Sequence, residues 1–459
     1  MFPFQVFELQ PSEGLGFIKL FDSLFNIVNA LNNRNLLNNV KFIYSPNSQL
    51  TIVQLASYNI NLVFDSCLQR LIVIELNLPV ASDSYNYRIK YKGEFASKFE
   101  FKAIYNKIFG PTFPGFLDKS TMDYYLSYPG IAFRFKGLKD ELESASSNLT
   151  NGDDDGSLIQ LLTNSSHDIN CSSISIFRGS SWKVASQRIA EYLKDPTEKG
   201  LISLESSADG QSIAEGNSGS ASIRSTGSPG TIAIRSAVVD LDKNDLTLFF
   251  SDHPTEESFN IWIGETTMNE VIRLLGPPDD YVLKPRFAKG EPTAYFKIHN
   301  YFKYGFDVVY RLDSTNAVHN CPTVKKLILH SNSVNSLEFM RYERFSFSLQ
   351  KMAAVGDSGS QNGNVLSVRS FSGFDNIKNT LFSGDSYSKP IFLDRKEYEL
   401  NPDNFNSNNI FELVNLDEKH CDDTNEEMKR WGLSKIYGLN RCIFEVLLEG
   451  DEVTSVTMF

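Results

Sequence analysis

A short module of one helix and three strands recurs along this chain, and it constrains the fold more than any other feature. Its clearest copy starts with a helical pattern at residues 266–275, which the sequence Gly276–Pro278 ends. Glycine after the last apolar turn caps a helix, and proline prevents its continuation. Three β-rich runs follow, at residues 295–299, 305–310 and 324–330. The pattern therefore predicts a helix followed by a three-stranded antiparallel meander.

Three further copies share the order of the elements more than the letters. Their helices are expected at residues 20–31, 101–110 and 374–384. The strands that follow them are expected at 51–55, 60–65 and 71–76, at 122–126, 130–135 and 174–178, and at 434–438, 441–447 and 453–459. The apolar positions of 20–31 fall on one helical face. An α+β protein without repeats could also show helices and strands in this order, so coincidence is the alternative.

One helix on a three-stranded meander buries too little surface to be stable alone, so the copies should share cores. We therefore expect an α+β fold of about four degenerate repeats of a helix and a three-stranded antiparallel meander, packed in pairs, with low-complexity loop insertions. A packed amphipathic helix is expected at residues 182–193. The predicted domains are an N-terminal half with repeats one and two (1–200), a mobile Ser/Gly-rich insertion (201–236), and a C-terminal half with repeats three and four (237–459).

Further insertions of polar composition interrupt the repeats near residues 140–170 and 352–370. Segments rich in Ser, Gly, Asn and Asp bury too little apolar surface to offset the entropy of ordering. These insertions are therefore expected to be mobile, like the central one.

The composition limits the kinds of partner. The chain has 459 residues, of which 41% are hydrophobic, and a formal net charge of −12. A chain of this size can bury substantial cores. Nucleic-acid binding relies on basic side chains that neutralise phosphates, so the acidic balance argues against that class of partner. The same balance argues against purely electrostatic docking on anionic membranes.

Targeting and redox features indicate a cytosolic protein. The first residues lack the basic start and long apolar core of a signal peptide, and no apolar run approaches the length that spans a bilayer. The cysteines are scattered and show no Cys-x-x-Cys spacing, so reduced thiols are expected rather than a disulfide framework. The five cysteines are Cys67, Cys171, Cys321, Cys421 and Cys442.

Two motifs resemble functional sites without the context that the chemistry needs. Gly356–Gly359 matches the sequence around a serine-protease nucleophile, with Ser358 as the candidate. It lies in a Ser/Gly-rich insertion rather than on rigid backbone beside a histidine and a carboxylate. Asp153–Gly156 lacks the alternating spacing and the distant glutamate of a calcium loop. A solvated acidic turn is the expected structure there.

The histidines show no metal-binding pattern. None is paired at i,i+4 on a helix, and only His420 adjoins a possible soft ligand, Cys421. His299 and His330 fall in predicted strands of the third repeat and could be neighbours, as structural histidines. There is no Walker A loop and no G-x-G-x-x-G after a strand. We therefore expect no catalytic residue, no metal ligand and no cofactor. The six histidines are His167, His253, His299, His319, His330 and His420.

Several stretches in this order and spacing resemble the phagosome assembly factor 1 family. They are residues 40–45, 60–65 with 69–75, 109–116, 324–330, and 441–446 with 453–457. The resemblance runs from about residue 14 to the end and fails only in the low-complexity insertions. No motif identifies the family's functional residues well enough to place them here, so the partner-binding residues stay unassigned.

The resemblance implies a non-enzymatic, cytosolic adaptor that is recruited to the forming autophagosomal membrane, the phagophore. It implies a WD-repeat β-propeller protein as the partner, and contact with phosphoinositide-bearing membrane that is indirect, through that partner. No nucleic acid and no small-molecule substrate are expected. The alternative is a trafficking adaptor at the trans-Golgi network, in transport from the Golgi to the plasma membrane. A contrasting class is an enzyme or ligand carrier with a pocket between paired modules.

Overall fold

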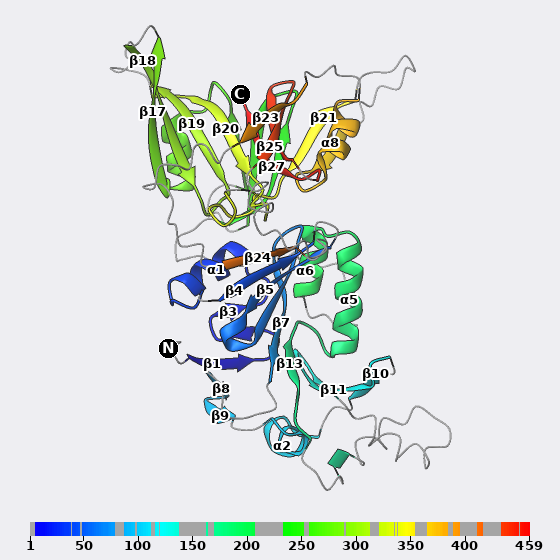
Figure 1. Cartoon of the computed structure of the whole chain (residues 1–459). Coiled ribbons are helices and arrows are strands. Elements are labelled where there is room, and N and C mark those ends of the chain that lie inside the picture. The colour runs from blue at the N-terminus through cyan, green and yellow to red at the C-terminus, as the bar shows by residue number, and fades with distance from the viewer. Residues whose placement is uncertain are drawn as a thin grey trace. The chain divides into compact units, whose positions relative to one another are not determined.

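The structure is a computed structural model, and it divides the chain into two compact units (Figure 1). Unit 1 comprises Met1–Ala221 and Asn408–Lys419, and unit 2 comprises Ser222–Ser407 and His420–Phe459. The residues that the structure describes are 5–37, 39–45, 48–78, 87–96, 99–111, 115–118, 120–136, 162–163, 169–206, 233–251, 257–288, 291–312, 321–334, 336, 338–353, 365–383, 389–394, 411–415, 433–448 and 450–459.

Unit 1 repeats one order of elements twice: short strands, a helix, and four antiparallel strands. The first set is β1 (Gln5–Gln10), β2 (Gly14–Leu15), β3 (Ile18–Lys19), α1 (Leu24–Asn32), β4 (Val40–Tyr44), β5 (Leu50–Leu55), the short helix η1 (Ala56–Tyr58), β6 (Ile60–Asp65) and β7 (Leu71–Asn77). The second set is β8 (Tyr87–Tyr91), β9 (Glu94–Ala96), α2 (Phe101–Ala103) continued by the π-helical turn η2 (Ile104–Ile108), β10 (Phe116–Asp118), β11 (Asp123–Tyr128), β12 (Ile131–Phe135) and β13 (Ser173–Ile176). Helices α5 (Trp182–Lys194) and α6 (Glu198–Glu205) follow.

The two sets of unit 1 join through equivalent strands. The last strands of the two meanders, β7 and β13, pair antiparallel, so that the sheet has the order β10-β11-β12-β13-β7-β6-β5-β4. The first strands of the two sets, β1 and β8, pair parallel in a second, smaller sheet. One more strand from far along the chain, β24 (Phe411–Asn415), adds to the outer side of β4 in parallel.

Unit 2 has the same order and the same pairing. Its first set is β14 (Ile234–Asp240), β15 (Asp245–Phe250), β16 (Ser258–Trp262), α7 (Met268–Leu275), β17 (Asp280–Ala288), β18 (Glu291–Tyr301), β19 (Phe306–Leu312) and β20 (Val324–His330). Its second set is β21 (Ser348–Met352), β22 (Val365–Arg369), α8 (Phe374–Leu381), β23 (Ile391–Asp394), β25 (Leu433–Leu439), β26 (Cys442–Leu447) and β27 (Val453–Met458). The last strands, β20 and β27, pair antiparallel, and the first strands, β14 and β21, pair parallel.

One backbone hydrogen bond recurs at the start of all four of the helices that precede a meander. The first helical residue donates its N–H to a carbonyl just before the last strand of the same meander. The four bonds join Leu24 to Gln69, Phe101 to Ile169, Met268 to Pro322, and Phe374 to Asp451, at 2.7–2.9 Å. This contact satisfies one of the N–H groups that a helix start leaves free. It also fixes the helix to the far end of its meander.

The expected three-stranded meander is wrong in its strand number, because each meander has four strands. The three predicted strands are present in every copy, and the missing one always comes first: β4, β10, β17 or β23. Each unit has eight antiparallel strands in its large sheet. The missed strands are the outermost of these eight, β4 and β10 in unit 1 and β17 and β23 in unit 2. An outer strand buries less surface, so its sequence shows less alternation. In β17, for example, Tyr281 and Leu283 are more than half exposed.

The structure also corrects the expected segment boundaries. Helix α6 and strand β14 occupy both ends of the insertion predicted at 201–236, and β22 lies inside the one predicted near 352–370. The central parts of the three predicted insertions lie outside the described residues. Residues 408–419, expected in the C-terminal half, belong to unit 1. The helix expected at 182–193 is present as α5, which buries Ala185 and Tyr192.

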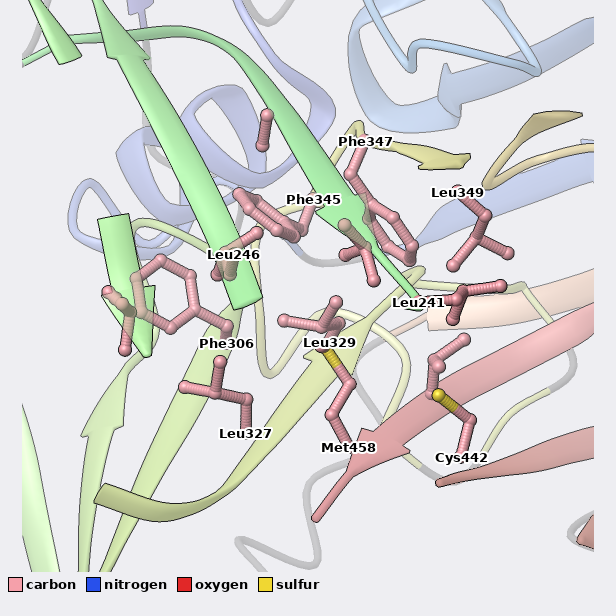
Figure 2. Packing of buried hydrophobic residues seen from close by; sticks show 14 of the residues in the cluster. Leu241, Leu246, Phe306, Leu327, Leu329, Phe345, Phe347, Leu349, Cys442 and Met458 are labelled. Carbon is pink, nitrogen blue, oxygen red and sulfur yellow. The ribbon is translucent and has the colours of Figure 1, made fainter. Parts of the chain in front are cut away.

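The core of unit 2 lies between its two sheets and the helices α7 and α8. Figure 2 shows side chains from strands of both sheets pointing toward one another, among them Leu246, Phe306, Leu327 and Leu349. Helix α7 begins with a capping box, in which Thr267 and Glu270 bond each other's backbone N–H groups. It ends at Gly276, whose φ of 81° suits a residue without a Cβ.

Candidate functional site

His299 and His330, the two histidines that the structure describes in predicted strands, are not neighbours. They lie on strands β18 and β20 and face opposite sides of the sheet. His299 shares its face with core residues and meets the ring of Tyr310 at a centroid distance of 4.9 Å. His330 shares the other face with Asp307 of β19. Successive side chains of a strand point to opposite faces of its sheet. His299 is paired with Val308 of β19, whereas His330 contacts Asp307, the residue before it, so the two rings lie on opposite faces.

His330 is the centre of a polar cluster, which we call the His330 cluster: the buried Asn300, Asp307, His330 and Tyr342, and the partly exposed Glu338. The Nε2 atom of His330 lies 3.0 Å from Asp307 Oδ2. Its Nδ1 atom lies 2.9 Å from Glu338 Oε2, in an ion-pair contact. The ring of Tyr342 stacks on the imidazole at a centroid distance of 3.8 Å.

Asp307 receives further hydrogen bonds inside the His330 cluster. The Tyr342 hydroxyl donates to Asp307 Oδ2 at 3.0 Å, and the Asn300 amide donates to Asp307 Oδ1 at 2.9 Å. The same amide donates to the Tyr342 hydroxyl at 3.1 Å. Asn300 and Asp307 are paired across β18 and β19, so the sheet register itself places them side by side. Buried polar groups need such partners to offset their lost hydration.

The electrostatics of the cluster favour a charged His330. Burial by itself lowers the pKa of His330, but hydrogen bonding and charge from Asp307 and Glu338 outweigh it and raise the pKa to about 9. Burial raises the pKa of Tyr342, so this phenol stays protonated and acts as a donor. His299 behaves in the opposite way: burial, with a smaller effect of Lys297, lowers its pKa to about 4. One sheet therefore carries a cationic and a neutral histidine at neutral pH.

The His330 cluster holds the segment between β20 and β21 against the sheet. Asn300, Asp307 and His330 come from three adjacent strands, whereas Glu338 and Tyr342 come from that segment. The Phe345 N–H continues the attachment by donating to the carbonyl of His330 in β20 at 3.1 Å. His330, Asp307, Asn300 and Tyr342 are each at most 4% exposed. Because a substrate could not reach these groups, the arrangement supports a structural role for the cluster.

The described cysteines are free thiols, as expected. Cys171 and Cys442 are buried, and burial raises the pKa of each to about 12, which makes them poor nucleophiles. Cys67 and Cys321 are partly exposed. The remaining sequence candidates lie outside the described residues: Cys421, Ser358, Asp153–Gly156, His167, His253, His319 and His420.

No group of three or more His, Cys, Asp and Glu side chains in the described part of the chain could hold a metal ion. No described helix has the length and apolar character needed to cross a membrane.

The exposed apolar side chains of the described surface include three small clusters, beside others such as the paired Met352 and Val365 of β21 and β22. On the hairpin of β17 and β18, Tyr281, Leu283 and Tyr295 share one face, and they are 58%, 53% and 44% exposed. On the hairpin of β8 and β9, Phe95 lies beneath the cationic groups of Arg88 and Lys90. Strand β23 exposes Ile391 and Phe392. Sequence reasoning missed all three, because outer strands carry weak periodicity.

The described residues define a mixed α+β protein of two compact units, with repeat-like strand pairing in four sheets. The chain belongs to the phagosome assembly factor 1 family, whose model matches residues 15–459. A PHAF1 protein of Arabidopsis thaliana is 28% identical over 134 residues. That alignment covers 28% of this chain and 32% of the plant protein. No solved structure matches the chain.

Proposed function

We propose that this chain is a non-enzymatic adaptor in autophagy, which associates with a WD-repeat β-propeller protein at the forming autophagosomal membrane. The observation that carries the proposal is the family match, which extends over nearly the whole chain, from residue 15 to 459. The family is described as a phagosome assembly factor. The buried state of Asn300, Asp307, His330 and Tyr342 agrees with a binding role, since these four groups are withheld from solvent.

Membrane contact in this proposal is indirect and runs through the propeller partner. The net charge of −12 provides no general attraction to anionic lipid. The purified chain alone should therefore not sediment with phosphoinositide-containing vesicles at physiological salt. Phosphoinositide-dependent sedimentation of the chain alone would contradict the indirect contact.

The test is an affinity purification of the tagged chain from its own cells, fed and starved, with mass spectrometry of the recovered proteins. Recovery of a WD-repeat propeller near stoichiometry, together with puncta on nascent autophagosomes during starvation, is the expected result. Recovery of coat or Golgi tethering factors, with constant Golgi overlap, would favour the trafficking alternative. A chain that purifies without any partner, but with a bound small molecule in native mass spectrometry, would contradict both.

The same purification can locate the contact with three matched variants, each of which makes one exposed apolar cluster polar. The variants are Tyr281→Ser with Leu283→Ser, Phe95→Ser, and Ile391→Ser with Phe392→Ser. All of these side chains are more than half exposed, so folding should be unaffected. Loss of the propeller from one variant, with retention in the other two, identifies the contact face. Retention in all three excludes these clusters as the main contact.

A further inference from the structure

Strand β24 pairs with the outer side of β4, although it lies far along the chain from the other strands of unit 1. Unit 1 is otherwise the continuous segment Met1–Ala221, and its second piece, Asn408–Lys419, supplies β24. In Figure 1 this strand is the orange one among the blue strands of unit 1. The chain leaves the large sheet of unit 2 after β23 and returns to it at β25. Residues 395–410 and 416–432 connect β24 to these two strands.

The pairing of β24 differs from every other pairing in its sheet. All neighbours from β10 to β4 are antiparallel, whereas β24 runs parallel to β4. The register is continuous over five residues, from Phe411 opposite Val40 to Asn415 opposite Tyr44. Parallel pairing is slightly less stable per residue than antiparallel pairing. The strand pairs with the sheet along one edge, that of β4.

Unit 2 shows that this architecture does not need a ninth strand. Its outer strand β17, the first meander strand of the first set, corresponds to β4 of unit 1, and among the described residues no strand pairs with the outer side of β17. In unit 1, Val40 and Phe42 of β4 are 1% and 0% exposed, so the core of unit 1 holds β4 in place. The edge of β4 is thus preformed, and β24 lies on it as an addition.

We propose that the outer edge of β4 is an acceptor site for an extended peptide segment of a partner protein, and that β24 is its exchangeable occupant within the chain. An extended segment that adds to a sheet edge gains affinity from main-chain hydrogen bonds and specificity from alternate side chains. The register and the sequence of β24 indicate the kind of segment: it runs parallel to β4 and is mostly apolar, with a glutamate, Glu412 in β24, at the position paired with Lys41. The proposal is independent of the propeller partner.

The first test measures binding of a fluorescent peptide with the sequence of residues 408–419. The full chain is compared with the variant Leu413→Pro, because proline removes an N–H donor and disfavours β24. We expect the peptide to bind the variant at least tenfold more tightly than the wild-type chain, since the tethered strand competes at high effective concentration. A folded variant that binds no better than the wild type would overturn the proposal.

Two controls keep the result interpretable. A second variant, in which a Gly/Ser sequence replaces residues 411–415, should bind the peptide as Leu413→Pro does and keep the circular dichroism of the wild type. Loss of the native spectrum in both variants would overturn the proposal, because β24 would then be an integral part of unit 1. A peptide of the same composition in scrambled order should not bind; equal binding would reveal nonspecific association and overturn it too.

A disulfide lock tests whether the peptide and β24 share one site. Lys41→Cys and Glu412→Cys, in a Cys421→Ser background, place thiols at paired positions, and adjacent strands lie about 4.8 Å apart. The oxidised chain should be a monomer that does not bind the peptide, and reduction should restore the weak binding of the unlocked chain. A disulfide-linked dimer would overturn occupancy within one chain. Peptide binding to the locked chain would overturn the shared site.

A charge exchange tests the proposed register. A peptide with Glu412→Lys should bind the Leu413→Pro chain roughly two- to fivefold more weakly than the original peptide, since like charges opposite each other in a sheet repel. Adding Lys41→Glu to the chain should reverse this preference. An unchanged preference would overturn the parallel register that places residue 412 opposite Lys41.

Discussion

At the scale of single residues, the side of the sheet that a histidine faces decides its charge. His299 and His330 both belong to one sheet of unit 2 and both are nearly fully buried. His299 faces aromatic rings, so burial dominates and the neutral form is favoured. His330 faces Asp307 and Glu338, so the charged form is favoured. A buried cation that is paired and hydrogen-bonded contributes stability only while it stays charged.

This difference predicts a pH dependence of stability. The pKa of His330 rises from 6.5 in the unfolded chain to about 9 in the fold, so its contribution is fully present below pH 6.5 and is lost as the pH rises through 9. His330→Asn should lower the free energy of unfolding at pH 6, by roughly a few kcal/mol given about 1.4 kcal/mol per pKa unit. It should also flatten the decline between pH 7 and 9. Urea unfolding followed by circular dichroism at several pH values measures both.

His299→Asn is the matched control for this prediction. Because burial and Lys297 lower the pKa of His299 to about 4, this histidine is neutral in the fold and in the unfolded chain above pH 7. The substitution should shift stability by a constant amount over pH 7–9 and leave the slope of the wild type unchanged. A slope that persists in His330→Asn but disappears in His299→Asn would reverse the assignment.

At the scale of elements, the same local devices recur in corresponding places. The turn between the second and third strands of each meander contains a residue with positive φ, which only glycine and a few polar residues adopt at low cost. These residues are Asn59, Gly130, Gly305 and Asn440. Two of them are also tightly enclosed: a Cβ at Gly305 would lie 2.2 Å from the carbonyl oxygen of Glu343. Local chemistry thus terminates the same strands in all four meanders.

Helix α7 offers a test of such a device, because its capping box is complete. Thr267→Ala removes the side-chain oxygen that accepts the Glu270 N–H, and it should lower the free energy of unfolding of unit 2 by about 1 kcal/mol. Thr267→Ser keeps the hydroxyl and should cost much less. Chemical denaturation of the two variants provides the comparison. Equal losses in both would assign the effect to the threonine methyl group instead of the cap.

At the scale of the whole molecule, each compact unit has its own buried residues and its own pair of sheets. Domains with separate cores can unfold separately, in which case the whole chain departs from two-state behaviour. The recurrent pairing explains why each unit needs two sets of elements. Only the union of two meanders, through β7 with β13 or β20 with β27, creates a sheet large enough to cover the core.

Matched core substitutions test the independence of the units. Leu62 in unit 1 and Leu327 in unit 2 are both fully buried, and leucine-to-alanine changes in cores cost about 2–5 kcal/mol. Leu62→Ala should shift one calorimetric transition of the chain to lower temperature, and Leu327→Ala should shift the other. If each variant moved both transitions together, the units would unfold as one cooperative system.

The amino-acid sequence by itself determined the local elements of this protein. β-rich runs marked the inner strands of every meander, some with period-two alternation as at residues 60–64 and 131–135, and the sequence Gly276–Pro278 marked the end of α7, because these signals depend on residues close together in the chain. The outer strands β10, β17 and β23 were missed for the same reason: they bury little, so their composition reports less of the fold. Mixed α+β structure with repeat-like pairing could therefore be predicted, whereas the strand number could not.

Only the tertiary structure decided which distant residues meet. No local pattern shows that β24 pairs with β4 across several hundred residues of chain, since edge pairing uses backbone groups that every residue carries. The His330 cluster is equally invisible in the sequence, because its members come from three strands and a separate segment and are aligned by register. The local sequence determined the helices and strands. Their pairings and the His330 cluster were determined by the surface that these elements bury together and by the hydrogen bonds between them.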